Sequence, residues 1–340
     1  MKKVFLSMAA FALVMASCSK EEVPGTDPAG VTNAVAIRIG QTVKGLDTKA
    51  PVVSGSEVTA TVLMSDAAST TADWSTFTPR SANVPTGANN AFTSDDERAT
   101  YTVATFNAGV TAADMVLTPA LYYPSSNHSH LKGVAPAGTV SSTAVTMNVK
   151  DGMQDVMVST SVDAGTKGSS AGSSVLPFAH KTTQLVFKMK LVAQASNGLW
   201  NGVASLKSIS IKNAQLPTGV TIASGDVTWT DPALFAVPGI NNSPIGTTAA
   251  SVGSPVMINA LGTVVIDAVI TAGGKDWVFN DVTVVNATTS SDLAVVIGSS
   301  HEITLTVNEP KTVAGSETSI SATATVAEWT AGAKGSADLN

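Results

Sequence analysis

The chain is built largely from short runs in which apolar and polar residues alternate. Alternation with a period of two predicts β-strands, because successive side chains of a strand point to opposite faces of its sheet. Such runs recur from residue 35 onward, with apolar positions at Val35, Ile37, Ile39 and Val43; Val58, Ala60, Val62 and Met64; Val145, Met147 and Val149; Leu185, Phe187, Met189 and Leu191; Val264, Ile266, Ala268 and Ile270; Ile303, Leu305 and Val307; and Ile320, Ala322, Ala324 and Val326. Most runs offer one face to a core and one to water, which predicts an all-β fold of packed antiparallel sheets.

The length and one irregular stretch suggest how these strands divide into domains. A chain of 340 residues is more typical of two domains than of one, at about 150 residues per domain. The stretch 161–174 is rich in Gly and Ser, so it is either an interdomain linker or a long hairpin loop. Placing the boundary there predicts an N-terminal β-sandwich over 50–174 and a C-terminal β-sandwich over 175–340.

The N-terminus has the pattern of an export signal. Two lysines precede an almost unbroken apolar run, Val4–Met15, and the small residues Ala16 and Ser17 lead directly to Cys18. A basic start, a short apolar run and small residues predict a secretory signal, which is too short to span a membrane. The cysteine after the small pair indicates a lipoprotein, with a signal over 1–17 and a lipid on the Cys18 thiol. An ordinary signal peptide with an incidental cysteine is the alternative.

Composition and charge narrow the class of protein further. Hydrophobic residues make up 44% of the chain, which excludes disorder caused by a lack of apolar residues. Charged residues are 13% and the net charge is −6, so the chain lacks the basic character expected of a nucleic-acid partner. Cys18 is the single cysteine, which rules out an intrachain disulfide and leaves packing to stabilise the fold.

The sequence offers few candidates for catalytic or metal chemistry. His128 and His130 flank Ser129, so on a strand they would share a face as two metal ligands could, but a third ligand at useful spacing is missing. Ser170 lies in a match to the Gly-x-Ser-x-Gly elbow, 168–172. That match falls within the Gly/Ser-rich stretch, whereas an elbow needs a strand before the serine and a helix after it. We therefore expect no catalytic residue, no metal site and no cofactor, and a chain that is not an enzyme.

Several short stretches, taken in order, are similar to motifs of a known protein family. They are Ala16 to Glu22; Val35 to Val43 followed by Leu46 to Ala50; Leu121 to Pro124; Asp155 to Val158; Leu176 to His180; and Ile320 to Trp329. Their order over nearly the whole chain resembles the fimbrillin family, the lipoprotein precursors of pilins that build type V pili on Gram-negative surfaces. The resemblance implies two transthyretin-like β-sandwich domains, export as a lipoprotein, and polymerisation by strand exchange after proteolysis.

The resemblance also assigns roles to both ends of the chain. It implies that 18–49 form a tether and a removable first strand, cut between Lys49 and Ala50 by a protease of trypsin-like specificity. The family carries Arg at the cleavage position, so Lys44 and Arg38 are alternative sites. The displaced strand would contain Val35, Ile37, Ile39 and Val43, and the donor strand Ile320, Ala322, Ala324 and Val326.

Elementary physics is compatible with such an exchange. A sheet that loses a strand exposes apolar side chains and unpaired backbone groups, which an extended segment of another chain can fill. The alternative is that both segments are ordinary sheet strands of one monomer.

The expected function is that of a fimbrial subunit at the cell surface. Its partners would be other pilin subunits in a homopolymer or a mixed fimbria, the processing protease, and the outer membrane through the lipid anchor before processing. One alternative is a monomeric surface lipoprotein that binds a glycan or a host protein. Another is a tip or anchor subunit of the same pilus.

Overall fold

A computed structural model describes residues 36–43, 52, 54–81, 92, 98–109, 112–123, 127–148, 150–170, 174–192, 199–200, 203–309 and 319–328. Over these ranges the protein is made of β-strands, with a single short 3-10 turn, η1 (Trp74–Thr76), as its helical element. The predicted all-β, sandwich-like fold is confirmed. Within the same ranges there is no helix with the length and apolar character needed to cross a membrane.

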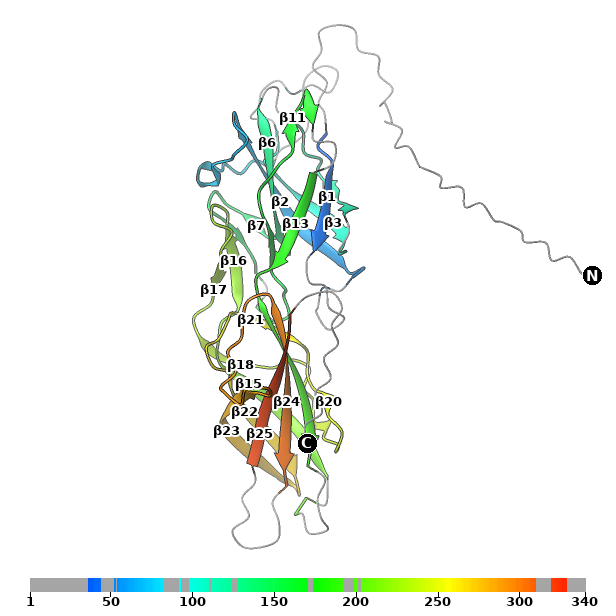
Figure 1. The fold of residues 1–340 in the computed structure, drawn as a ribbon, viewed down its shortest axis with the longest axis vertical. Coiled ribbons are helices and arrows are strands. Elements are labelled where there is room, and N and C mark those ends of the chain that lie inside the picture. Colours follow the sequence, from blue (N-terminus) through cyan, green and yellow to red (C-terminus); the bar gives the residue numbers. More distant parts are fainter. Residues whose placement is uncertain are drawn as a thin grey trace, which may run out of the picture.

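Strands from the first half of the chain form a curled sheet at one end of an elongated molecule (Figure 1). In pairing order they are β4 (Ala113–Asp114), β1 (Ile39–Val43), β13 (Ser174–His180), β9 (Met157–Ser159), β6 (His128–Ala135), β2 (Glu57–Ala67), β3 (Tyr101–Asn107) and β5 (Val116–Thr118), with β10 (Val162–Asp163) beside β6. β1 runs parallel to β13, and the other pairings of this sheet in the described chain are antiparallel.

The described part of the Gly/Ser-rich stretch, 161–170 and 174, forms local structure within this first half. After β10, the strands β11 (Gly165–Thr166) and β12 (Ser169–Ser170) pair as a small hairpin. The stretch therefore matches the hairpin alternative, and β13 follows it.

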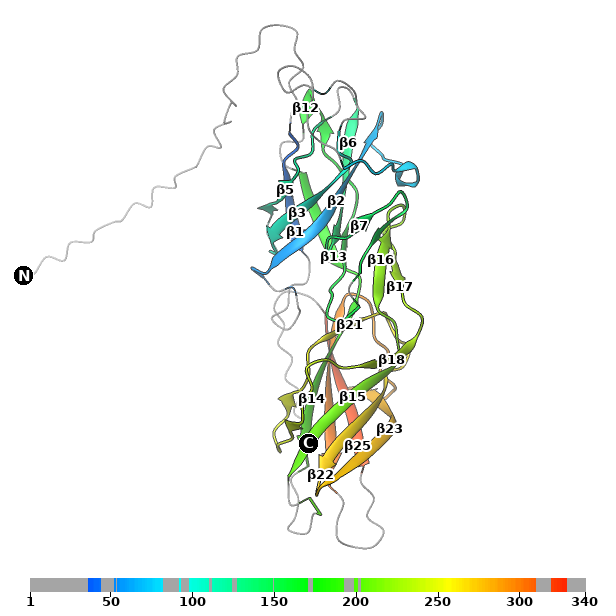
Figure 2. The same cartoon turned by 180° about the vertical axis from the view of Figure 1, so that it is seen from behind.

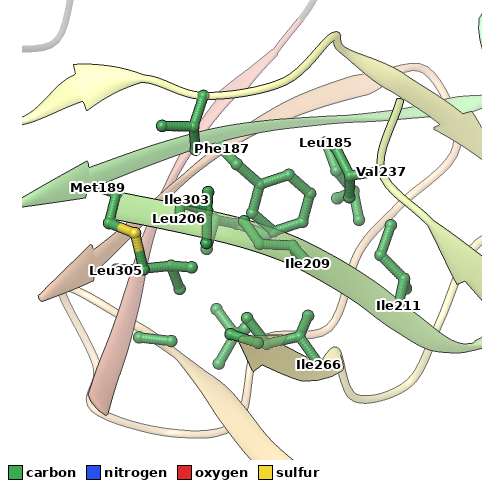
Figure 3. Packing of buried hydrophobic residues seen from close by; sticks show 14 of the residues in the cluster. Leu185, Phe187, Met189, Leu206, Ile209, Ile211, Val237, Ile266, Ile303 and Leu305 are labelled. Atoms are coloured by element: carbon green, nitrogen blue, oxygen red, sulfur yellow. The ribbon is translucent and has the colours of Figure 1, made fainter. Parts of the chain in front are cut away.

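Strands from the second half form another curled sheet at the opposite end (Figure 1). In pairing order they are β18 (Ala233–Ala236), β15 (Ala204–Ala214), β22 (Val265–Ala272), β23 (Lys275–Asn286), β25 (Ser319–Glu328), β24 (Ser299–Asn308), β14 (Thr183–Leu191) and β20 (Ala250–Ser251), with β19 (Ser243–Pro244) beside β15 and β21 (Val256–Ile258) beside β14. The sheet curls around one continuous apolar core, in which Phe187, Met189, Ile209, Ile266 and Leu305 point toward one another (Figure 3).

The change from one sheet to the other falls between His180 and Thr183. β13 pairs with β1 and β9 in the first sheet, whereas β14 begins the second sheet. The sequence predicts a boundary between residues 174 and 175, at the start of β13. Two apolar alternating runs follow each other here with only 181–182 between them, so periodicity alone does not reveal that they belong to different sheets.

A third, small sheet joins the two halves. Its strands, in order, are β17 (Val227–Trp229), β16 (Pro217–Thr221), β8 (Ala144–Thr146) and β7 (Thr139–Val140). The hairpin β16–β17 follows β15 of the second half, yet β16 pairs with β8 of the first, and Figures 1 and 2 show it beside the first sheet. Gly219 permits this approach, because a Cβ there would lie 2.7 Å from the carbonyl oxygen of Val145.

Side chains from both halves pack around this linking sheet. Val220 and Ile222 of the second half share an apolar cluster with Leu63, Val134 and Val158 of the first. All five are buried. The two halves therefore have a common piece of core in addition to their covalent link.

Polar contacts reinforce the same junction. The buried Lys132 ammonium donates to the carbonyl oxygen of Ile222 at 2.7 Å and lies 5.7 Å from the ring centroid of Trp74. Burial lowers the pKa of Lys132. Between the sheets, Asp155 accepts from Thr182 at 3.1 Å and pairs with His180 at 2.7 Å.

Candidate functional site

The first strand, β1, fills a slot in the first sheet between β13 and β4. It pairs in parallel with β13 over five residue pairs, from Ile39 opposite Ser174 to Val43 opposite Phe178. On its other side it pairs with β4 at two residues. Single backbone bonds extend that side: Ile37 donates to Leu121 at 2.8 Å and Val43 to Gly109 at 2.9 Å. Both edges of β1 are thus hydrogen-bonded, and its removal would leave unpaired backbone on both walls of the slot.

Alternate residues of β1 enter the core of the first sheet. Ile37, Ile39 and Val43 are 3%, 2% and 1% exposed, and they belong to one apolar cluster with Phe106 and Phe178. The rings of these two phenylalanines stack with centroids 5.5 Å apart. The slot that β1 occupies is therefore lined by apolar side chains.

The core beneath the slot depends on a close approach between β6 and β13, the two strands that pair with β9. Gly133 of β6 lies against the Phe178 ring, where a Cβ would come within 2.4 Å of Cζ. The absence of a side chain at this position lets the ring lie flat over β6. Phe178 can then stack on Phe106 and pack in the same cluster as β1.

One inward position of β1 is polar. Gln41 is 0% exposed, and its Nε2 donates to the carbonyl oxygen of Asn107 at 2.9 Å. Its Oε1 is buried and accepts no hydrogen bond from the described residues. The residue is opposite Leu176 of β13 and Ala113 of β4. Sequence reasoning did not single out Gln41, although its place in the alternation Ile37, Ile39, Gln41, Val43 could have marked it as an inward polar residue.

The processing and lipidation residues lie mostly outside the described ranges. Cys18, Val35, Lys44, Lys49 and Ala50 are all in this group. Arg38, the remaining candidate cleavage position, is described. Its side chain is exposed, and its carbonyl oxygen accepts from Ser174 N at 3.3 Å, at the β1–β13 edge.

The predicted donor segment is a strand of the second sheet in this structure. β25 pairs with β24 along its whole length, and its residues 322–324 also pair in parallel with β23. In this register Ile320, Ala322, Ala324 and Val326 stand opposite Val307, Leu305, Ile303 and His301. Ala322, whose side chain is described, is 2% exposed within the core. The structure thus places the predicted displaced strand and the predicted donor strand in different sheets, each paired on both sides.

The histidines and serine considered for other chemistry have structural contacts. On β6, the Nδ1 atom of His128 lies 2.8 Å from an oxygen of Asp163, and the Nε2 atom of His130 lies 2.9 Å from the carbonyl oxygen of Ser69. Ser170 lies on β12, in the small hairpin. No cluster of three or more His, Cys, Asp or Glu side chains suited to a metal occurs among the residues that the structure describes.

Comparison with known proteins gives structural likeness without sequence likeness. No protein-family model matches the chain, and no curated protein matches its sequence. A candidate cell adhesion protein of Bacteroides ovatus has a TM-score of 0.50 and 11% identity, over 89% of this chain and 100% of that one. The likeness lies in the fold.

Two other solved structures are similar at slightly lower scores. A candidate cell adhesion protein of Bacteroides uniformis has a TM-score of 0.48 and 15% identity, over 86% of this chain and 99% of its own. A fimbrial protein of Bacteroides vulgatus has a TM-score of 0.46 and 14% identity, over 88% and 100%. The structural neighbours are therefore candidate cell adhesion and fimbrial proteins.

Proposed function

We propose that this chain is a structural subunit of a surface fimbria that supports adhesion, that it is not an enzyme, and that it needs no cofactor. The observation that carries the proposal is the place of β1, a short strand near the N-terminus that fills an apolar slot between β13 and β4. Residues 44–50, which include Lys44 and Lys49, follow it directly in the sequence. The fold shared with the Bacteroides ovatus protein supports an adhesive role.

The slot supplies the free energy for assembly in this proposal. Full burial of an aliphatic side chain stabilises a complex by roughly 1.5–3 kcal/mol, so the sites of Ile37, Ile39 and Val43 would favour any strand that refills them. Unpaired backbone on both walls adds directional hydrogen bonds, and alternate side chains fix the register. A chain that has lost β1 would therefore recruit an extended segment of another subunit.

In this proposal, export and processing determine when β1 is removed and its slot becomes available. The proposed route is lipidation at Cys18, transport to the outer membrane, and cleavage at Lys49–Ala50 by a trypsin-like protease, with Lys44 and Arg38 as alternative positions. Cleavage after Lys49 or Lys44 would separate the lipid anchor and β1 from the rest of the subunit, whereas cleavage after Arg38 would leave Ile39–Val43 attached to it. Other subunits, identical or mixed, would then be its partners in the fimbrium.

The donor in this proposal is β25, with Ile320, Ala322, Ala324 and Val326 as inward residues. β25 has to leave its pairs with β24 and β23 before it can enter the slot of a neighbour. Assembly is therefore a conformational change in the second sheet as well as in the first.

The first experiment trims purified precursor with a trypsin-like protease and examines the products by electrophoresis in detergent without heating. Ladders of detergent-resistant oligomers are expected from trimmed chain and not from intact precursor. Trimmed chain that stays monomeric at high concentration would contradict the proposal.

A disulfide that holds β25 in its own sheet tests whether β25 is the donor strand. Thr304 of β24 and Thr323 of β25 are directly opposite and half-buried, so a Thr304→Cys, Thr323→Cys variant can hold β25 in its own sheet. The oxidised form should give no ladder and the reduced form should restore it, which makes each sample its own control. Equal ladders in both forms would exclude β25 as the donor.

A second candidate function has one observation in its favour. Because β25 is paired on both sides, it fits an ordinary strand of a monomer. A monomeric surface lipoprotein that binds a glycan or host protein would keep 18–49, and an anchor subunit would also keep its lipid and β1. A tip subunit need not donate a strand. Mass spectrometry of the protein isolated from the cell surface distinguishes these possibilities by its first residue. A chain that starts at Ala50 supports the trimmed subunit, and a chain that starts at a lipidated Cys18 supports the lipoprotein or the anchor.

A further inference from the structure

The inward positions of 37–43, the segment that contains β1, are apolar except one. Ile37, Ile39 and Val43 are nearly fully buried, and Gln41 is as buried as they are, at 0% exposure. It lies in the part of the strand that is paired on both sides, opposite Leu176 and Ala113. An amide at such a position has no access to water.

Gln41 satisfies only half of its hydrogen-bonding capacity. The Nε2 atom donates to the Asn107 carbonyl oxygen at 2.9 Å. The Oε1 atom is buried and has no donor among the described residues. A buried acceptor without a partner loses its hydration and gains nothing in return, whereas an apolar group of the same shape avoids that loss.

We propose that Gln41 sets how readily β1 leaves its slot. The three apolar side chains and the paired backbone stabilise β1 in its slot. The orphaned amide oxygen lowers this stability, because it loses its hydration in the slot and regains it when the strand leaves. Gln41 would thus make β1 releasable after the chain is cut, while the apolar side chains and the paired backbone keep it bound in the intact chain.

The inference deepens the proposed function and rests on it for its biological meaning. The inward positions of the proposed donor, Ile320, Ala322, Ala324 and Val326, include no polar side chain. A donor strand in the slot would therefore bury no orphaned amide. Replacement of β1 by such a strand removes an unfavourable contact, which gives the exchange a direction.

The test measures release of β1 and not polymer formation. Precursor is cut with a lysine-specific endoprotease, which can act at Lys44 or Lys49 and spares Arg38, and dissociation of the N-terminal fragment is followed by size exclusion and mass spectrometry. In Gln41→Leu the fragment should dissociate about fivefold more slowly than in the unaltered chain, because the penalty for burying the orphaned oxygen exceeds the net contribution of the Nε2–Asn107 hydrogen bond that the substitution also removes. The intact variant should also melt at a higher temperature.

A second substitution at the same position works in the opposite direction. Gln41→Glu places a carboxylate in the slot and should speed release at neutral pH, since a buried unpaired charge is less favourable than a buried amide. If Gln41→Leu fails to fold, Gln41→Met, which is unbranched like glutamine, takes its place with the same expected slowing.

A buried glutamine of the second sheet is the matched control. Gln184 is also 0% exposed, but its Oε1 accepts from the Ser300 hydroxyl. Gln184→Leu should lower stability by orphaning Ser300, and it should leave the release of the β1 fragment unchanged. A Gln41→Leu chain that releases the fragment as fast as the unaltered chain would overturn the inference.

Failure of the inference and failure of the proposed function give different results. If no variant forms ladders but Gln41→Leu slows release, the role of Gln41 stands and the fimbrial assembly route falls. If ladders form and release is insensitive to position 41, the assembly route stands and the role of Gln41 falls.

Discussion

His301 is a buried histidine of the second sheet whose titration should make that sheet sensitive to acid. It lies on β24 opposite Val326 of β25, and it is 0% exposed. Burial lowers its pKa from 6.5 to about 4. The Val296 N–H donates to its Nε2 at 3.4 Å, which requires the neutral ring. The imidazole is therefore uncharged in the folded chain over the range in which an exposed histidine would become protonated.

The sign of the pH effect follows from this lowered pKa. The unfolded chain takes up a proton near pH 6.5 and the folded chain only near pH 4, so the contribution is complete above 6.5 and is lost as the pH falls toward 4. The shift corresponds to about 3 kcal/mol in the free energy of unfolding. Urea unfolding between pH 7.5 and 4 should show this loss in the unaltered chain, and a His301→Leu chain should lack it. Carboxylates titrate in both chains, so the difference between their two plots of unfolding free energy against pH isolates the contribution of His301. Plots that run parallel would disprove the effect.

At the scale of elements, the sequence predicts strands well where alternation is regular. All apolar positions of the runs at 58–64, 185–191 and 303–307 are buried on β2, β14 and β24. β15 was not predicted because its buried residues, Leu206, Ile209 and Ile211, break the period of two. A register shift between Leu206 and Ser208 changes which face the following residues occupy, and such a bulge has no signature in hydrophobicity alone.

Hydrophobic alternation predicts only part of the candidate site. The alternation of Ile37, Ile39 and Val43 marks β1 as a strand with one buried face. Its partners, β13 and β4, could not be found, since Ser174 follows Ile39 by more than a third of the chain and pairing across that distance leaves no local pattern. The position of β25 between β24 and β23 is likewise a property of the whole sheet and not of its own sequence.

The position of β25 predicts the result of a truncation. A chain that ends at Thr318 lacks β25, which leaves β24 unpaired on one side and removes Ala322 from the core. We expect the second sheet to lose its cooperative thermal transition, measured by circular dichroism. A chain that ends at Glu328 keeps all of β25 and should melt as the full chain does. A cooperative second sheet in the Thr318 truncation would show that β25 is dispensable for folding.

At the scale of the whole molecule, the linking sheet makes the two halves depend on each other. β16 pairs with β8, and Val220 and Ile222 complete a cluster otherwise supplied by the first half. The two halves are therefore expected to unfold together.

Ile222 tests this coupling. It is 0% exposed, so Ile222→Ala should lower the free energy of unfolding by about 2–5 kcal/mol, because a cavity remains where the side chain was. Calorimetry should show the single transition of the unaltered chain divide into two. Ile270→Ala is the control, since Ile270 is equally buried but lies in the core of the second sheet alone. It should lower the temperature of the single transition without dividing it. One undivided transition in the Ile222 variant would mean that coupling does not pass through this cluster.

The pairing of β1 with β13 also sets the order in which an emerging chain can fold. As the chain emerges from its N-terminus, Ile39 to Val43 arrive early, but Ser174 to Phe178 must follow before β13 can pair with them. Closing so long a loop is entropically unfavourable and slow compared with forming hairpins such as β2–β3. The first strand is thus among the last parts of its sheet to be installed. A strand that docks late onto an otherwise formed sheet can also depart without disrupting that sheet, so the last step of folding, run in reverse, would be the step that the proposed assembly requires of β1.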